Sequence, residues 1–159
     1  DDTIRLRNKY CPQAKISVLS NSTFIHRPKI HEALAKVDNN ILKLDTINAE
    51  YIKEVDRPTQ PSYDVNRIIA DIKSFNGQAI IQTMFMKGTT EDGYDVDNTT
   101  EAFVAPWLET IKEIAPREVM IYTIDRETPD LHLQKATHEE LDAIRDRVIA
   151  LGIPCTASY

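Results

Sequence analysis

The sequence predicts an α/β fold in which parallel strands alternate with helices. Four apolar, β-branched runs each end in a small group of polar residues, and each is followed by a stretch with helical spacing. Continuous apolar runs are typical of parallel strands that are buried on both faces. Because ligands of such sheets bind beyond the carboxyl ends of the strands, the repeated polar ends predict one shared binding surface. The runs are ISVLS (16–20), ILKL (41–44), AIIQTMF (79–85) and VMIYTI (119–124).

Size and composition indicate one globular domain. The 159 residues are 42% hydrophobic and 28% charged, enough to bury a core, and the net charge of −6 argues against a nucleic-acid surface. No apolar run approaches the roughly 20 residues that span a bilayer, so we expect no membrane partner and a cytoplasmic location. Cys11 and Cys155 stand at opposite ends of the chain, which favours reduced thiols, with a disulfide between them as the alternative.

The elements of the first half follow from periodicity and turn residues. The strand at 16–20 leads to a helix that starts near Pro28, and a second strand covers 41–45. A short helix at 48–55 is cut by the turn-rich stretch 57–61. The next helix starts with Ser62 or Asp64 as its cap, carries apolar residues at helical spacing and ends in a left-handed Asn76-Gly77. Its apolar positions are Val65, Ile68, Ile69, Ile72 and Phe75.

The second half repeats this alternation. A strand at 79–86 precedes a loop at 87–98 that we interpret as solvated, and then a helix that Pro106 should kink or delay. A strand at 118–124 follows, and a capping box at 137–140 starts the next helix. A short strand at 153–157 ends the order βαβαβαβαβ.

Two architectures fit this order of elements. A doubly wound open sheet would be complete with five strands. A partial βα, TIM-like barrel would instead leave an open strand edge, which favours a homodimer or another partner. The pattern of elements does not separate the two.

Polar residues at the end of the first strand are the first candidates for the site. Ser20, Asn21 and Ser22 offer an amide and two hydroxyl groups within one turn, which suits a ribose or an amino-acid head group. The alternative is a turn held by local hydrogen bonds, in which Ser and Asn are common.

Further candidates lie on the later strands. Lys43 and Asp45 share one face of their strand by alternation, and form either a buried, functional pair or a solvated one. Gln82 needs a partner inside an apolar strand, and Met84 shares its face. Arg126 suits a carboxylate ligand or a surface salt bridge. The four histidines lack metal-ligand spacing, and no glycine-rich phosphate loop is present in the sequence, so we assign no metal ligand.

The series SVLSNST, ILKLDT, D-R-P, IIQTMFMKG and VMIYTIDR-x-x-P resembles the later half of the radical SAM superfamily. The branch that it resembles contains iron-sulfur oxidoreductases related to pyruvate formate-lyase activating enzyme. The resemblance implies a partial or full βα barrel whose mouth binds S-adenosylmethionine. In that family a 4Fe-4S cluster reductively cleaves adenosylmethionine to a 5′-deoxyadenosyl radical, which abstracts a hydrogen atom.

The resemblance also implies roles for the candidate residues. Ser20, Asn21 and Ser22 match a T-N-G that borders the nucleoside, with Ser22 in place of the glycine. The K-x-D of Lys43 and Asp45 matches a D-x-K of the activating enzymes with the two residue types exchanged. Gln82 and Met84 match family residues that contact the methionine moiety, and Arg126 matches a polar family residue near adenosylmethionine.

The sequence departs from the family at the metal. It lacks the C-x-x-x-C-x-x-C motif that ligates the cluster, and Cys11 and Cys155 cannot replace three thiolates of one loop. We therefore expect residues 1–159 to be the C-terminal part of a radical SAM barrel without its cluster-binding strands, inactive alone and without catalytic residues. The expected partner of the intact enzyme is a protein or peptide such as a glycyl-radical enzyme. The alternatives are a cluster-free binding or scaffold domain, and an unrelated α/β enzyme for a sugar or phosphate ligand.

Overall fold

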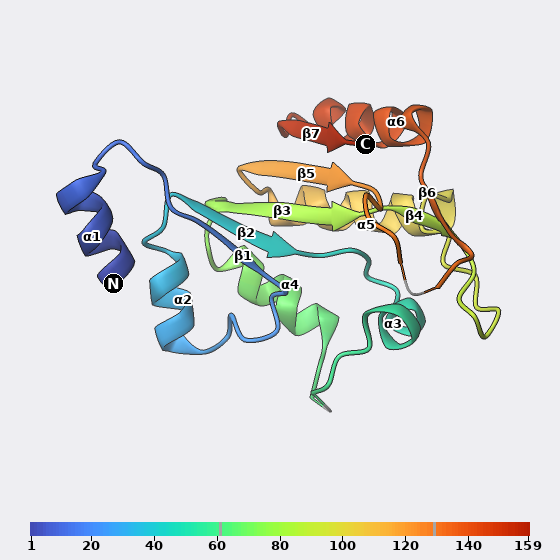
Figure 1. The fold of residues 1–159 in the computed structure, drawn as a ribbon, viewed down its shortest axis with the longest axis horizontal. Helices are drawn as coiled ribbons and strands as arrows, with labels where there is room; N and C mark the ends of the chain where they lie inside the picture. Colours follow the sequence, from blue (N-terminus) through green and yellow to red (C-terminus); the bar gives the residue numbers. More distant parts are fainter. Residues whose placement is uncertain (61, 129) are drawn as a thin grey trace.

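The computed structural model describes residues 1–60, 62–128 and 130–159, so the predicted turn residue Pro61 and Pro129 of the last motif lie outside the description. The described chain forms a five-stranded parallel sheet flanked by helices (Figure 1). In spatial order the strands are β1 (Ser17–Ser20), β2 (Asn39–Lys43), β3 (Ala79–Met84), β5 (Glu118–Tyr122) and β7 (Cys155–Ser158).

The strand order decides between the two predicted architectures. Along the chain, each new strand of the sheet is added next to the previous one and always on the same side. The direction of winding therefore never reverses. A doubly wound sheet reverses at its switch point, whereas a βα barrel does not. The fold is therefore an α/β partial barrel with parallel strands.

The helices lie between the strands along the sequence and cover one face of the sheet. Sheet residues of the main core, such as Leu42, Ile81 and Val119, are paired in register and point to the same face, where apolar side chains of the helices pack on them. The helices that contribute to this core are α2 (Pro28–Leu34), α4 (Val65–Lys73), α5 (Glu101–Ile114) and α6 (His138–Ala150).

The other face of the sheet has no such helical cover among the described residues. Lys43, Gln82 and Met120 lie in register across it and are half-buried, and Thr156, the next residue in this row, is exposed. This face and the strand ends are therefore where a ligand can reach the sheet.

Several predicted helix ends are confirmed. Asp64 accepts a hydrogen bond from the Asn66 main-chain N–H and caps α4. Thr137 and Glu140 form the reciprocal capping box of α6. Asn76 and Gly77 both have positive φ, at 51° and 76°, and follow α4 as predicted.

Other details differ from the prediction. Met86–Gly88, placed in the solvated loop except for Met86, forms β4 and pairs antiparallel with β6 (Leu133–Lys135). Strands of three residues are too short for a readable alternation of polar and apolar residues, so a periodicity analysis misses them. Pro106 does not delay α5, which begins at Glu101. Ahead of β1, residues Asp2–Tyr10 form a separate helix, α1, none of whose residues is buried.

The short helix predicted at 48–55 has two parts. Asn48 caps the single turn α3 (Ala49–Tyr51), which continues as a π-helix, η1 (Ile52–Asp56). Arg57 ends η1 in a left-handed conformation, with φ at 45°. Single π-helical turns widen the helix and often occur at functional sites. Here the turn ends beside the carboxyl end of β2, where the pocket described below opens.

Candidate functional site

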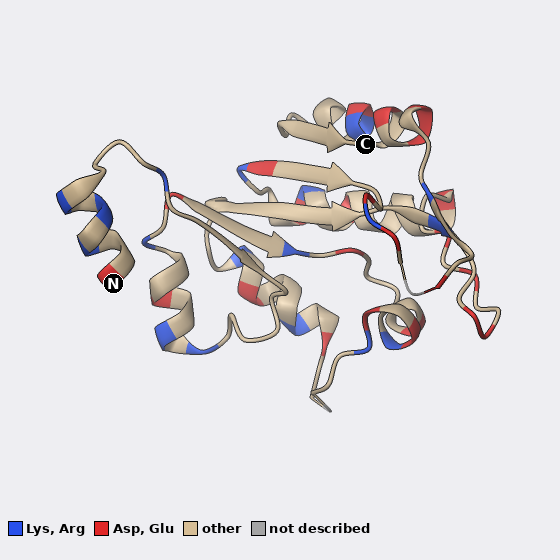
Figure 2. Ribbon diagram, viewed as in Figure 1, with Lys and Arg blue, Asp and Glu red and all other residues tan. Residues whose placement is uncertain are grey.

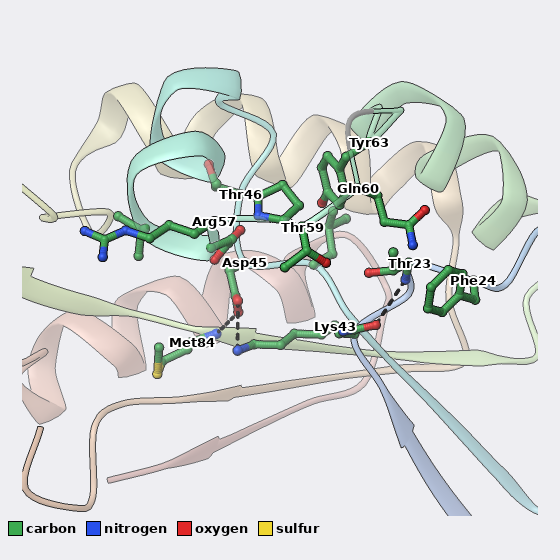
Figure 3. Close-up of a pocket in the computed structure, with 15 residues that line it drawn as sticks. Thr23, Phe24, Lys43, Asp45, Thr46, Arg57, Thr59, Gln60, Tyr63 and Met84 are labelled. Atoms are coloured by element: carbon green, nitrogen blue, oxygen red, sulfur yellow. Dashed lines mark hydrogen bonds and ion pairs between the residues drawn. The ribbon is translucent and has the colours of Figure 1, made fainter. Parts of the chain in front are cut away.

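A pocket of about 510 Å³ lies at the carboxyl ends of β1, β2 and β3 (Figure 3). The end of the sheet forms its floor, and residues 55–60 together with Tyr63 form the opposite wall. Four of the predicted site residues line it: Asn21, Lys43, Asp45 and Met84. The strand ends thus converge as the sheet geometry predicts.

Lys43 and Asp45 form an ion pair with 3.1 Å between Nζ and the carboxylate. The Asp45 side chain is 6% exposed and also accepts a 2.8 Å hydrogen bond from the Met84 main-chain N–H, whereas the Lys43 side chain is 36% exposed. Burial raises the pKa of Asp45, and the Lys43 ammonium counteracts this rise. Of the two interpretations offered by the sequence, the structure shows the buried pair for Asp45, with Lys43 reaching solvent.

Charged residues are otherwise sparse on the sheet itself. In Figure 2 most of each strand is uncharged, and a basic position followed by an acidic one marks the end of β2.

A second carboxylate, that of Asp56 at the end of η1, also lines the pocket. The surrounding protein and the negative charge of Asp45 raise the pKa of Asp56 to about 7, while Lys43 lowers it. Asp56 is an exposed residue, so water screens part of this effect.

Two tyrosines border this charged group. Tyr63 lines the pocket, and burial with the nearby Asp56 carboxylate raises its pKa to about 12. Tyr122 lies near Lys43 on the uncovered face of the sheet; burial raises its pKa, and the Lys43 ammonium counteracts the rise. Both phenols are therefore neutral near pH 7 and offer a hydrogen-bond donor.

The three candidate residues at the end of β1 have different roles in the structure. Asn21 is exposed, lines the pocket and accepts a 3.2 Å hydrogen bond from the Thr23 main-chain N–H through its side-chain oxygen. Ser20 accepts a 3.1 Å hydrogen bond from the Ser22 main-chain N–H. Ser22 is 1% exposed, and its hydroxyl donates a 2.9 Å hydrogen bond to the Lys43 main-chain carbonyl. Ser20 and Ser22 thus shape the turn, and Asn21 faces the pocket.

Of the candidate residues from β3 onward, only Met84 lines the pocket. Gln82 lies beside Lys43 in register on the uncovered face and does not line the pocket, whereas Met84, two residues on, does. Arg126 is exposed beyond the end of β5, away from the residues that line the pocket. Its neighbour Asp125 pairs with Lys135 at 3.8 Å. The alternative interpretation of Arg126, a surface salt bridge with Asp125 or Glu127, has no such pair among the described residues.

Eleven of the fifteen residues that line the pocket were not assigned to the site by the sequence reasoning. The D-R-P motif supplies Asp56, Arg57 and Pro58, and its only signal in the sequence was its place in the resemblance. A periodicity argument misses them because the π-helical turn shifts Asp56 out of an α-helical register. The other unassigned lining residues are Thr23, Phe24, Leu44, Thr46, Val55, Thr59, Gln60 and Tyr63.

The donor set does not fit an iron-sulfur cluster. Within residues 1–60, 62–128 and 130–159, no group of three or more His, Cys, Asp or Glu side chains is placed to hold a metal ion. Both cysteines are free and lie far from the pocket lining, Cys11 after α1 and Cys155 in β7. The sequence has two cysteines and lacks the three thiolates of a C-x-x-x-C-x-x-C motif, so the described residues do not fit a 4Fe-4S cluster. In the same described part, no helix is long and apolar enough to cross a membrane.

Sequence comparison links the chain to proteins without an assigned activity. No protein-family model matches it. A UPF0026 protein of Helicobacter pylori (strain J99) is 30% identical over 116 residues, which are 70% of this chain and 34% of that protein. The chain therefore spans about a third of the length of the curated relatives that it matches.

Several solved structures share the fold of this chain. A radical SAM methyltransferase from Sphaerobacter thermophilus matches 91% of this chain and 40% of its own, with a TM-score of 0.66 and 17% identity. A domain of pyruvate-formate lyase-activating enzyme from Bacteroides vulgatus matches 99% of this chain and 91% of its own, with a TM-score of 0.63 and 13% identity. SuiB from Streptococcus suis, solved with S-adenosylmethionine, matches 91% of this chain and 33% of its own, with a TM-score of 0.64 and 14% identity. The predicted resemblance is thus confirmed at the level of structure: the chain has the α/β partial-barrel fold of the radical SAM enzymes.

Proposed function

We propose that the pocket at the ends of β1–β3 binds S-adenosylmethionine, and that this chain is the C-terminal wall of a radical SAM enzyme. The observation that carries the proposal is the convergence of Asn21, Lys43, Asp45 and Met84 on one pocket of a sheet with this fold. In the intact protein, the cluster is held by residues outside this chain.

The size and chemistry of the pocket support this ligand. A volume of about 510 Å³ falls within the range of about 300–1,000 Å³ that is usual for small-molecule sites. Lys43 reaches solvent and can bind the carboxylate of the ligand. The Asn21 side-chain oxygen is taken by Thr23, which leaves its amide N–H groups for the ribose or the base.

Apolar side chains complete the lining. Phe24 and Met84 border the pocket and offer surfaces to the adenine and to the methionine chain. Bound adenosylmethionine would supply the adenosyl group as a radical precursor. The residues of this chain bind and orient that ligand, and they exclude water from one side of it.

We also propose a class of substrate for the intact enzyme. The structural likeness to a pyruvate-formate lyase-activating enzyme supports a protein or peptide substrate, such as a glycyl-radical enzyme. We propose an oxidoreductase or activase activity for the longer protein on the same likeness. The competing proposal is a scaffold domain that keeps the fold and binds no adenosyl ligand.

Calorimetric titration of adenosylmethionine into the purified 159-residue chain tests the proposal. We expect a dissociation constant below about 1 mM for a site of this size that lacks the cluster. Asn21→Ala and Lys43→Met should weaken binding by about tenfold each, which corresponds to the loss of one charged or strong polar contact. Asn8→Ala and Lys112→Met, exposed residues of α1 and α5, are the matched controls. A folded chain that does not bind the ligand supports the scaffold domain instead.

A further inference from the structure

The pocket lining carries the carboxylates of Asp45 and Asp56, and the Lys43 ammonium forms an ion pair with only the first of them. Lys43 and Asp45 form one pair, and Asp45 is further satisfied by the Met84 main-chain N–H. Asp56 lines the same pocket, yet its carboxylate has no hydrogen bond or ion pair to any residue within the described part of the chain. One ammonium thus serves two carboxylates.

Arg57 does not supply the missing positive charge. It also lines the pocket, but its Nε donates a 2.8 Å hydrogen bond to the Glu54 main-chain carbonyl. Figure 3 shows its guanidinium directed away from the Lys43–Asp45 pair. The charges that act on Asp56 are those of Asp45 and Lys43, with the repulsion by Asp45 the larger of the two.

We propose, on the basis of the function proposed above, that Asp56 is the residue by which this pocket selects a positively charged adenosyl ligand over a neutral one. The sulfonium of adenosylmethionine takes the place of the counter-charge that Asp56 lacks. S-adenosylhomocysteine, which carries a neutral thioether at the same position, does not satisfy it.

A proton competes with the ligand for this position. The free pocket holds Asp56 partly protonated near neutral pH, because its pKa is raised to about 7. A cation placed beside the carboxylate favours its ionised form, so the ligand displaces this proton. Affinity for the sulfonium ligand should therefore increase as the pH rises toward neutrality.

The neighbouring titratable groups do not share this behaviour. Tyr51 on α3 and Tyr63 beyond η1 both feel the Asp56 charge, and both have a raised pKa, so they are neutral near pH 7. Lys43 on β2 has a raised pKa and remains an ammonium. Burial also raises the pKa of Asp45, and its ion pair with Lys43 counteracts this rise, so the Asp56→Asn variant decides which carboxylate releases a proton.

The experiment compares adenosylmethionine, S-adenosylhomocysteine and sinefungin, which has an ammonium-bearing carbon in place of the sulfonium. Each is titrated at about pH 6 and about pH 7.5, in buffers of different ionisation enthalpy. We expect both cationic ligands to bind more tightly at the higher pH, by up to about tenfold per unit of pKa change, with proton release. S-adenosylhomocysteine should bind more weakly than either, with little dependence on pH.

Asp56→Asn should abolish both the proton release and the preference for cationic ligands. Because the ligand's own amino group still titrates in this variant, the variant separates that contribution from the contribution of Asp56. Asp92→Asn removes the same charge from an exposed loop and should change neither. Equal binding of charged and neutral ligands, unchanged by Asp56→Asn, overturns the inference and leaves the proposed function intact. If none of the three ligands binds, the proposed function itself fails.

Discussion

The Ser22 hydroxyl donates a 2.9 Å hydrogen bond to the main-chain carbonyl of Lys43, and so joins the end of β1 to the end of β2. Ser22 has a φ of 66°, in the left-handed region that favours glycine. The serine keeps the backbone turn and adds a bond between the strands. It therefore positions the neighbours that face the pocket, Asn21 on one strand end and Lys43 on the other.

Ser22 variants test this relationship. Ser22→Ala removes the hydroxyl but keeps a β-carbon in the left-handed region, and it leaves the Lys43 carbonyl without its partner. We expect it to lower the free energy of unfolding by about 1–3 kcal/mol. Ser22→Gly loses the same bond but relieves the backbone, so it should be more stable than Ser22→Ala by about 1 kcal/mol. Urea denaturation measures the order, and a glycine variant less stable than the alanine variant would contradict the account.

Loss of the Lys43 ammonium should leave a buried carboxylate unpaired. We expect Lys43→Met to destabilise the fold by about 1–3 kcal/mol, less than a fully buried pair because the Lys43 side chain is 36% exposed. Asn in place of Asp45 still accepts the Met84 N–H, so Lys43→Met combined with Asp45→Asn should recover part of the loss. Lys73→Met, which breaks an exposed 3.7 Å pair with Glu113, is the control and should cost at most about 1 kcal/mol. A double variant less stable than Lys43→Met argues against the pairing.

The contribution of Asp56 to stability should fall as the pH rises toward neutrality. Burial and Asp45 raise the pKa of Asp56 from 3.8 to about 7 in the folded chain, so the folded state binds more protons than the unfolded state between these values. A raised carboxyl pKa contributes stability below the unfolded value, and this contribution is lost as the pH rises through the folded value. Because Asp56 is exposed, we expect a loss of about 1 kcal/mol between pH 4 and pH 8, rather than the full effect. Thermal or urea unfolding across this range checks the slope, which Asp56→Asn should reduce.

Local signals in the sequence predicted much of the fold because their causes are local. The Thr137 capping box and the Asn76-Gly77 helix end depend on neighbouring residues, and both form. The order of strands depends on distant pairings, so two architectures remained until the sheet was seen. Asn40 shows a further limit: its polarity indicated a break before the second strand, yet it lies inside β2 and is 4% exposed.

The residues of the site also fall into those that local patterns predict and those that depend on distant packing. Alternation along β2 placed Lys43 and Asp45 on one face, and the pair forms. The same kind of reasoning did not reveal that Gln82 lies beside the pocket and outside its lining, because that depends on where the wall from η1 ends. Nor could it place Asp56, whose position depends on a π-helical turn and on the left-handed Arg57 that follows. Both features depend on packing, which a periodicity argument does not contain.

The sheet edges predict self-association. Among the described strands, β1 and β7 each pair on one side, and Leu19 of β1 is 63% exposed. Exposed strand edges pair with other chains unless charge or cover prevents it, so we expect the 159-residue chain to form homodimers or larger species as its concentration rises. Leu19→Lys places a charge at the β1 edge and should shift the chain toward the monomer, whereas Leu131→Lys, at an 87% exposed loop position, should not. Light scattering across a concentration series measures this. If the unmodified chain is a monomer at every concentration, the β1 edge is protected, and the prediction is wrong.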